Sequence, residues 1–123
     1  MTIEEAIKSV NSLKPNNYTD SEKIKWLSSL DQIIKTEIID RHEGWEEITF
    51  DGYSDTTPTT TQMLAPDGYD DLYLYWLESR IDYYNAEYAK YNNSITAFNT
   101  AYSSLERYYN REHMPLGTKI KYF

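Results

Sequence analysis

The chain has 123 residues, a formal net charge of -8 and no cysteine. This length fits one domain with one core, and the lack of cysteine excludes a disulfide framework and thiolate chemistry. The acid is unevenly spread, because residues 1–67 carry a net charge of -7 and residues 68–123 a net charge of -1. Such a surface repels a phosphate backbone, which disfavours ordinary nucleic-acid binding.

The N-terminal segment is acidic where a signal peptide is basic, and no apolar run reaches the ~18 residues that a membrane span needs. We therefore expect a soluble protein that is made in the cytoplasm and has no membrane partner. Aromatic residues are 15% of the chain although the mean hydropathy is -0.75. Rings should thus carry much of the buried area beneath a very polar surface.

Two capping boxes open the chain, each a threonine followed three residues later by a glutamate. The pairs are Thr2 with Glu5 and Thr19 with Glu22. Apolar residues then recur at helical spacing, which predicts a short helix over about residues 3–13 and a second over about residues 20–40. The apolar stripe of the second helix is widened by Trp26 and Ile33, so this helix should pack on two neighbours.

Residues 41–67 break the helical pattern with two glycines, two prolines and a threonine-rich run. They are expected to form a long loop or arm, which in a compact domain is usually functional or ordered by a partner. Within it, Ile48, Phe50 and the turn at Asp51 and Gly52 suggest a brief strand or hairpin.

From Leu77 onward, large apolar residues recur in alternating steps of four and three. They are Leu77, Ile81, Tyr84, Tyr88, Tyr91, Ile95, Phe98, Tyr102, Leu105 and Tyr109. This heptad seam predicts either one long helix from Asp70 to Arg111 or a helix broken near Asn92, with Asn93 or Ser94 as the cap of the second arm. We favour the long helix, because a hairpin gives no reason for the register to persist.

Pro115 ends the helical pattern, and residues 114–123 read as an extended tail. In the tail, apolar and lysine positions alternate from Lys119 to Tyr122. Such a tail could add as a strand to another subunit or meet its acidic face. The expected fold is thus mainly α and a single helical domain, with two N-terminal helices, a long loop, a long aromatic helix and a C-terminal tail.

No catalytic or metal constellation is present in the sequence. Each histidine, His42 and His113, lacks a second ligand at helical spacing, and the acidic loop does not match a calcium loop. No nucleophile elbow, phosphate loop or dinucleotide motif occurs. We therefore expect no enzyme activity, no cofactor and no bound metal.

Three segments carry a resemblance to a known family: residues 1–16 (MTIEEAIKSVNSLKPN), residues 26–39 (WLSSLDQIIKTEII) and residues 69–115 (YDDLYLYWLESRIDYYNAEYAKYNNSITAFNTAYSSLERYYNREHMP). They resemble the head-tail connector proteins, also called adaptor or neck proteins, of tailed phages and prophages of Gram-positive bacteria. The likeness covers nearly the whole chain and is weakest in residues 44–66. It rests on a pattern of helices and aromatic positions.

The resemblance implies a helical virion protein at the junction of capsid and tail. Such subunits form a ring, typically of twelve, below the portal protein, which extends the channel for DNA and receives the next neck or tail protein. DNA passes through without specific binding. Carried over to this sequence, Tyr84, Tyr88, Tyr91, Phe98 and Tyr102 match the packed faces of the long helix, and residues 118–123 match a C-terminal arm that contacts the portal or a neighbour.

Together these patterns give the candidate interface residues Trp45, Phe50, Tyr84, Tyr88, Tyr91, Phe98, Tyr102, Tyr109, Lys119, Ile120, Lys121, Tyr122 and Phe123. A second hypothesis is a small acidic inhibitor that mimics DNA and captures a basic host nuclease or repressor. That role needs carboxylates at roughly phosphate spacing along one face, whereas the acid here lies mostly in one loop and at helix ends.

Overall fold

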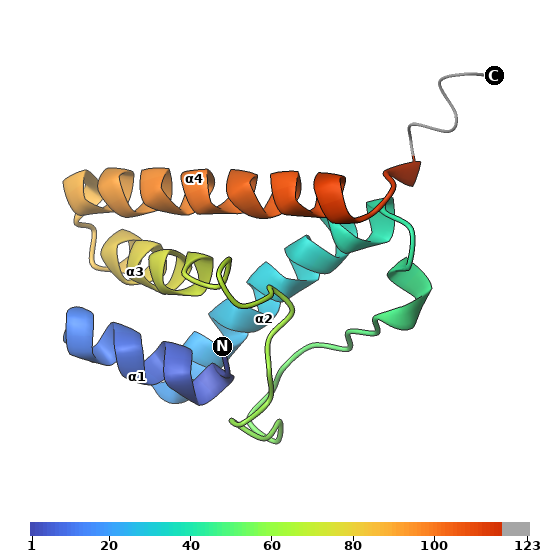
Figure 1. Ribbon diagram of the computed structural model, residues 1–123. Coiled ribbons are helices and arrows are strands. Elements are labelled where there is room, and N and C mark those ends of the chain that lie inside the picture. Colours follow the sequence, from blue (N-terminus) through green and yellow to red (C-terminus); the bar gives the residue numbers. More distant parts are fainter. Residues whose placement is uncertain (117–123) are drawn as a thin grey trace.

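The computed structural model describes residues 1–116, and within them the fold is mainly helical, as the sequence predicts. The helices are α1 (Ile3–Leu13), α2 (Asp20–Glu37), α3 (Leu72–Tyr84) and α4 (Tyr88–Glu112), with short 3-10 helices η1 (Ile39–Arg41) and η2 (Trp45–Glu47). The described part contains no named strand, only two isolated bridges. In Figure 1, α4 lies along one edge and α3 runs antiparallel beside it. Helix α1 lies on the other side of α3, and α2 crosses obliquely from beside α1 to the C-terminal end of α4.

Both predicted capping boxes are confirmed. Each threonine hydroxyl accepts from the backbone N–H of its glutamate at 3.1 Å, and the glutamate accepts from the threonine N–H at 3.2 Å. These reciprocal bonds satisfy N–H groups that have no partner within the helix and fix where α1 and α2 begin. The second helix ends at Glu37, slightly earlier than expected, and continues as the tight turn η1.

The apolar faces of all four helices meet in one core. It contains fully buried residues of each helix, among them Val10, Leu27, Leu77 and Leu105, together with Met63 and Ala65 from the loop. Burying aliphatic and aromatic area in this way supplies the main driving force for folding.

The favoured continuous helix over residues 70–111 is wrong. The alternative of a helix broken into two arms is confirmed, but the break does not lie near Asn92. The chain turns at residues 85–87, where Ala86 takes a left-handed φ of 58°. The N–H of Glu87 bonds the Asp82 carbonyl at 2.9 Å, and that of Ala86 bonds Tyr83 at 3.0 Å. This is the Schellman arrangement that ends many helices. It usually carries glycine at the left-handed position, so an alanine there gives no signal in the sequence.

Neither Asn93 nor Ser94 caps a helix, because both lie inside α4. Ser94 is buried and donates its hydroxyl proton to Asp82 of α3 at 3.1 Å. The heptad seam therefore runs through both arms of a hairpin. Heptad spacing fixes which residues share a face, but it does not decide whether the helix continues.

The long loop is ordered by this chain's own N-terminus and by α2. The N–H groups of Ile3 and Glu4 bond the carbonyls of Thr61 and Thr59, at 3.2 and 3.0 Å, so the threonine-rich run satisfies the open end of α1. The expected strand at Ile48 and Phe50 is wrong, since the N–H of Tyr53 bonds a side chain of α2, the Ser28 hydroxyl, at 2.9 Å. The loop's polar backbone is satisfied by helix ends and side chains, without a partner strand.

The chain beyond α4 returns to the end of α2. Pro115 forms an isolated bridge with His42, and the N–H of Glu43 bonds the Met114 carbonyl at 2.9 Å. The C-terminal end of α4 and the segment from η1 to η2 therefore lie together at one end of the molecule (Figure 1). The predicted tail residues Lys119, Ile120, Lys121, Tyr122 and Phe123 lie outside the described residues.

Candidate functional site

The turn between α3 and α4 carries a group of exposed tyrosines. Tyr83, Tyr84 and Tyr88 are 48%, 56% and 61% exposed, and half-buried Tyr91 packs edge-on against Tyr83 at 5.6 Å. Their side-chain hydroxyls hydrogen-bond to no other residue of the described chain. We call these four tyrosines and Arg80 the tip surface. Large exposed rings that retain free hydroxyls are typical of sites that bind other proteins.

Arg80 is held among the rings of the tip surface. Its guanidinium carbon lies 4.3 Å from the ring centre of Trp76, 5.7 Å from that of Tyr83 and 5.9 Å from that of Tyr91. Its Nε is buried without a hydrogen-bond partner, and Arg80 forms no ion pair with any residue from 1 to 116. The rings thus orient a cation whose charge no carboxylate of the described chain balances.

The tip surface rests on the start of α2. The ring of Tyr84 stacks on Trp26, with centroids 5.6 Å apart and planes at 9°, and Tyr18 meets the same tryptophan edge-on at 5.4 Å. The Tyr18 hydroxyl donates to the Asn85 side chain at 2.7 Å. These contacts hold the turn in place, so the exposed rings are presented by a supported backbone.

The other candidate residues are not brought to the tip surface. Trp45 is 39% exposed at the opposite end, with the Lys35 ammonium 5.6 Å from its ring, and Phe50 is half-buried against Tyr53. Phe98 and Tyr109 are core residues and Tyr102 is half-buried. The five candidates from Lys119 to Phe123 lie outside the described residues. The sequence therefore identified Tyr84, Tyr88 and Tyr91 of the tip surface but missed Arg80 and Tyr83, which lie off the seam.

A buried carboxylate organises the interior behind the loop. Asp31 is fully buried and accepts hydrogen bonds from the Tyr73 hydroxyl at 2.6 Å, the Tyr53 hydroxyl at 2.5 Å and the Leu64 N–H at 3.1 Å. Burial raises the pKa of the Asp31 carboxyl, and the two tyrosine hydrogen bonds partly oppose that shift. Burial beside Asp31 also raises the pKa values of Tyr53 and Tyr73.

This network is structural. The Tyr73 hydrogen bond joins α3 to α2, and the bonds from Tyr53 and Leu64 hold the loop against α2, away from the tip surface. The sequence analysis overlooked Asp31. Its signal was a carboxylate at the position four residues after Leu27, on the apolar face of the second helix.

A second buried carboxylate ties α1 to the helical hairpin. Asp82 of α3 is 1% exposed, and its two oxygens accept from the Lys14 ammonium at 2.6 and 2.7 Å. Nearby Glu78 has a pKa raised by burial, an effect that Lys14 partly opposes. This ion pair positions the start of α4 through Ser94 and has a structural role.

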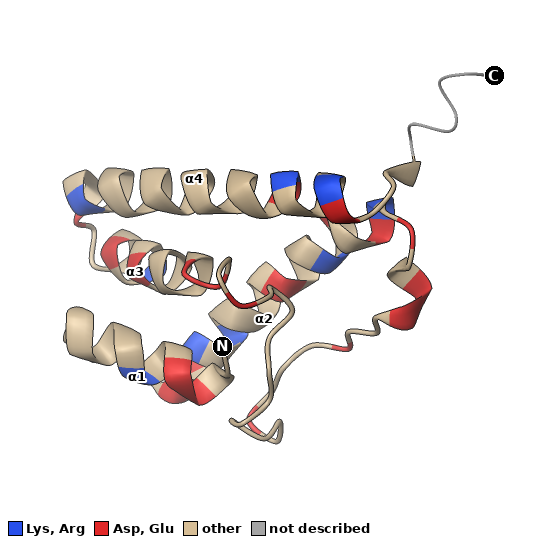
Figure 2. Ribbon diagram, viewed as in Figure 1, with Lys and Arg blue, Asp and Glu red and all other residues tan. Residues whose placement is uncertain are grey.

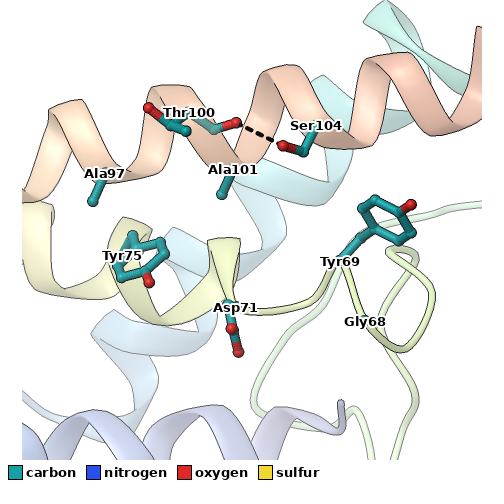
Figure 3. Close-up of a pocket in the computed structure, with 8 residues that line it drawn as sticks. All are labelled: Gly68, Tyr69, Asp71, Tyr75, Ala97, Thr100, Ala101 and Ser104. Carbon is teal, nitrogen blue, oxygen red and sulfur yellow. Dashed lines mark hydrogen bonds between the residues drawn. The ribbon is translucent and has the colours of Figure 1, made fainter.

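A hollow of about 690 Å³ lies between the start of α3 and the middle of α4. Figure 3 shows Tyr69 and Tyr75 on its two sides, with Ala97 and Ala101 above them. The Ser104 hydroxyl bonds the carbonyl of Thr100 within α4 at 3.2 Å, so it is already engaged. Asp71 is the charged residue among those that line the hollow. This set of small and aromatic side chains offers contact area but no pair of reacting groups.

Both histidines pack at the ends of helices. His42 is buried, with Nδ1 2.6 Å from the Ile38 carbonyl and Nε2 2.8 Å from the Asn110 side-chain oxygen, and His113 stacks on Tyr109. Over residues 1–116 no group of three or more metal-ligating side chains is placed to hold an ion. In the same part of the chain, no helix combines the length and apolar character needed to cross a bilayer.

Comparisons of the chain with models of protein families, with curated proteins and with solved structures find no match.

Proposed function

We propose that this chain is a subunit of a phage head-tail connector, a structural ring that lies below the portal and joins capsid to tail. The observation that carries the proposal is the tip surface, where exposed rings surround a cation that has no ion-pair partner among residues 1–116, at one end of a small helical subunit. Tyrosine and arginine are enriched among the residues that dominate binding energy at protein interfaces. The sequence resemblance to connector proteins supports the same role.

In this role the subunit binds proteins and lets DNA pass. A ring, typically of twelve copies, would bind the portal on one side and a further neck or tail protein on the other. The net charge of -8 supports a channel wall that repels the phosphate backbone, so that DNA slides without sticking. The location of the working protein would then be the virion, at the junction of capsid and tail.

The test is the mass of the full-length protein in solution, measured by light scattering alone and with the portal protein encoded beside it. The connector proposal predicts weak association of the protein alone and a ring in fixed stoichiometry on the portal. A stable monomer or dimer that does not bind the portal refutes it.

That outcome would favour the second candidate, an acidic inhibitor that mimics DNA. The acidic residues of this chain are spread over the start of α1, the segment from η1 to η2, the loop before α3 and parts of α2, α3 and α4 (Figure 2). A mimic of one DNA strand needs them in a row on one face, so this distribution favours the connector. Capture of a basic host DNA-binding protein by the purified chain would reverse that preference.

A further inference from the structure

We infer that the tip surface of one copy binds the acidic corner of the next copy, which we define as Trp45, Glu46 and Glu47 of η2. Copies would thus join head to tail through two different surfaces. The inference rests on the proposed connector function, since it names the contact that would build the ring. Its occupant is a second copy of this chain, chosen because the two surfaces complement each other in charge and in aromatic character.

At the tip surface, the charged side chain without an ion-pair partner among the described residues is the cation Arg80. Lys14 is paired with Asp82 at 2.6 Å, and Lys90 is paired with Glu87 at 2.6 Å. Among the described residues Arg80 has ring contacts but no ion pair, and its planar guanidinium suits two-point binding of a carboxylate. An incoming carboxylate would meet a cation already oriented by Trp76, next to tyrosine hydroxyls that bond no residue of the described chain.

At the acidic corner, the charged side chains without an ion-pair partner among the described residues are carboxylates. Glu46 and Glu47 are exposed, and their carboxylates form no ion pair or hydrogen bond with another described residue, whereas the neighbouring cations Lys35 and Arg41 are paired with Asp40 and Glu37. Trp45 stands beside them, 39% exposed. The corner therefore offers what the tip surface lacks, namely unpaired carboxylates next to a large ring.

The two surfaces lie at opposite ends of the molecule. The tip surface is at the N-terminal end of α4, and the acidic corner adjoins its C-terminal end, where Glu43 bonds Met114. The 25 residues of α4 span about 37 Å at ~1.5 Å per residue. One molecule cannot join its own two ends over that distance. Complementary surfaces at opposite ends produce a heterologous contact, which closes into a ring or extends into a filament.

The first experiment reverses charge on each surface of the full-length protein. One variant is Arg80→Glu and the other is the double change Glu46→Lys with Glu47→Lys. We expect each variant alone to self-associate at least tenfold more weakly than the wild type in sedimentation velocity, because like charges then face each other at the contact. The control, Asp20→Lys with Asp71→Lys, changes net charge as much as the corner variant and should associate like the wild type. Circular dichroism checks that each variant folds.

Mixing the two variants is the decisive measurement. A mixture restores opposite charges at both kinds of junction, since the Arg80 of one variant meets wild-type glutamates and the new glutamate meets the new lysines. We expect association to return in the mixture, with the two variants alternating. No recovery, or variants that associate as well as the wild type, overturns the inference.

A cross-linking experiment gives an independent readout, because the chain has no native cysteine. The variant with Tyr88→Cys and Glu46→Cys should form a ladder of multimers with a short bis-maleimide, whereas Tyr88→Cys with Asp20→Cys should not. Failure of the ladder counts against this contact. The connector proposal is judged separately by portal binding: rings on the portal that tolerate Arg80→Glu refute only the contact, and head-to-tail association without portal binding refutes only the connector.

Discussion

Replacing Tyr73 with phenylalanine removes one oxygen atom from the interior and tests whether the Asp31 network holds the loop in place. The Tyr73 hydroxyl donates to Asp31 at 2.6 Å and accepts from the Ala65 N–H at 2.8 Å. Tyr73 is fully buried, so water cannot replace either bond. The ring itself stays, which keeps the loss of apolar burial small.

The expected cost follows from these two bonds. A hydrogen bond to a charged group contributes about 2 kcal/mol, and a buried N–H left without a partner costs at least about 1 kcal/mol. We therefore expect the free energy of unfolding to fall by about 3 kcal/mol. For a domain of this size such a loss corresponds to a drop in Tm of roughly 12 °C.

The assay is urea unfolding followed by circular dichroism and by tryptophan fluorescence. The matched control is Tyr53→Phe, which removes a hydroxyl from the same carboxylate while the Leu64 N–H still donates to that oxygen. Because Tyr53 is half-buried, its loss should cost about 1 kcal/mol. A Tyr73→Phe variant that is no less stable than Tyr53→Phe would refute the reasoning.

Three further predictions concern the same fold. Replacing Ala86, whose φ is 58°, with glycine should raise the free energy of unfolding by about 1 kcal/mol. The control Ala97→Gly, inside α4, should lower the free energy of unfolding by about the same amount. If Ala86→Gly is less stable than the wild type in thermal unfolding, the backbone at Ala86 is not strained. Lys14→Met strands the buried Asp82 carboxylate and should cost about 3 kcal/mol in urea unfolding, whereas Lys8→Met, which breaks no ion pair, should change stability by less than ~0.5 kcal/mol. Finally, burial raises the pKa of Asp31 above its unfolded value of ~3.9, so the proton is bound more tightly in the folded state. That contribution is fully present below about pH 4 and is lost as the pH rises through the raised pKa, so the stability of the wild type relative to Asp31→Asn should fall from about pH 4 upward. A difference that rises with pH would show that the shift has the opposite sign.

Local signals predicted the first two helices well. The capping boxes at Thr2 and Thr19 act within four residues, and the apolar stripes that follow are buried as their spacing indicates. A local turn also lies at Asp67 and Gly68, where Gly68 has a φ of 92° and the Tyr69 N–H bonds the Pro66 carbonyl. Such features depend on neighbouring residues alone, so they can be read without knowing the fold.

The hairpin could not be read in that way. Its turn uses Ala86 in a conformation that glycine usually takes, and Asn92 and Asn93, which looked like a break, lie exposed within α4. The pairing of Ser94 and Lys14 with Asp82 stabilises the antiparallel arrangement, and Lys14 lies 68 residues from Asp82 in sequence. The long-range partner therefore decided what the local pattern left open.

The sequence by itself determined the helical class, the helix starts set by capping boxes and the tyrosines that could supply contact area. Tertiary structure alone decided which tyrosines are exposed, because Tyr84 and Tyr88 belong to the same heptad seam as the buried Phe98 and Tyr109. The tertiary structure also decided which charged side chains, among them Arg80, have no ion-pair partner within the described residues. Periodicity reports the face of one helix, whereas the exposure and pairing of a side chain depend on the neighbours that the fold brings to that face.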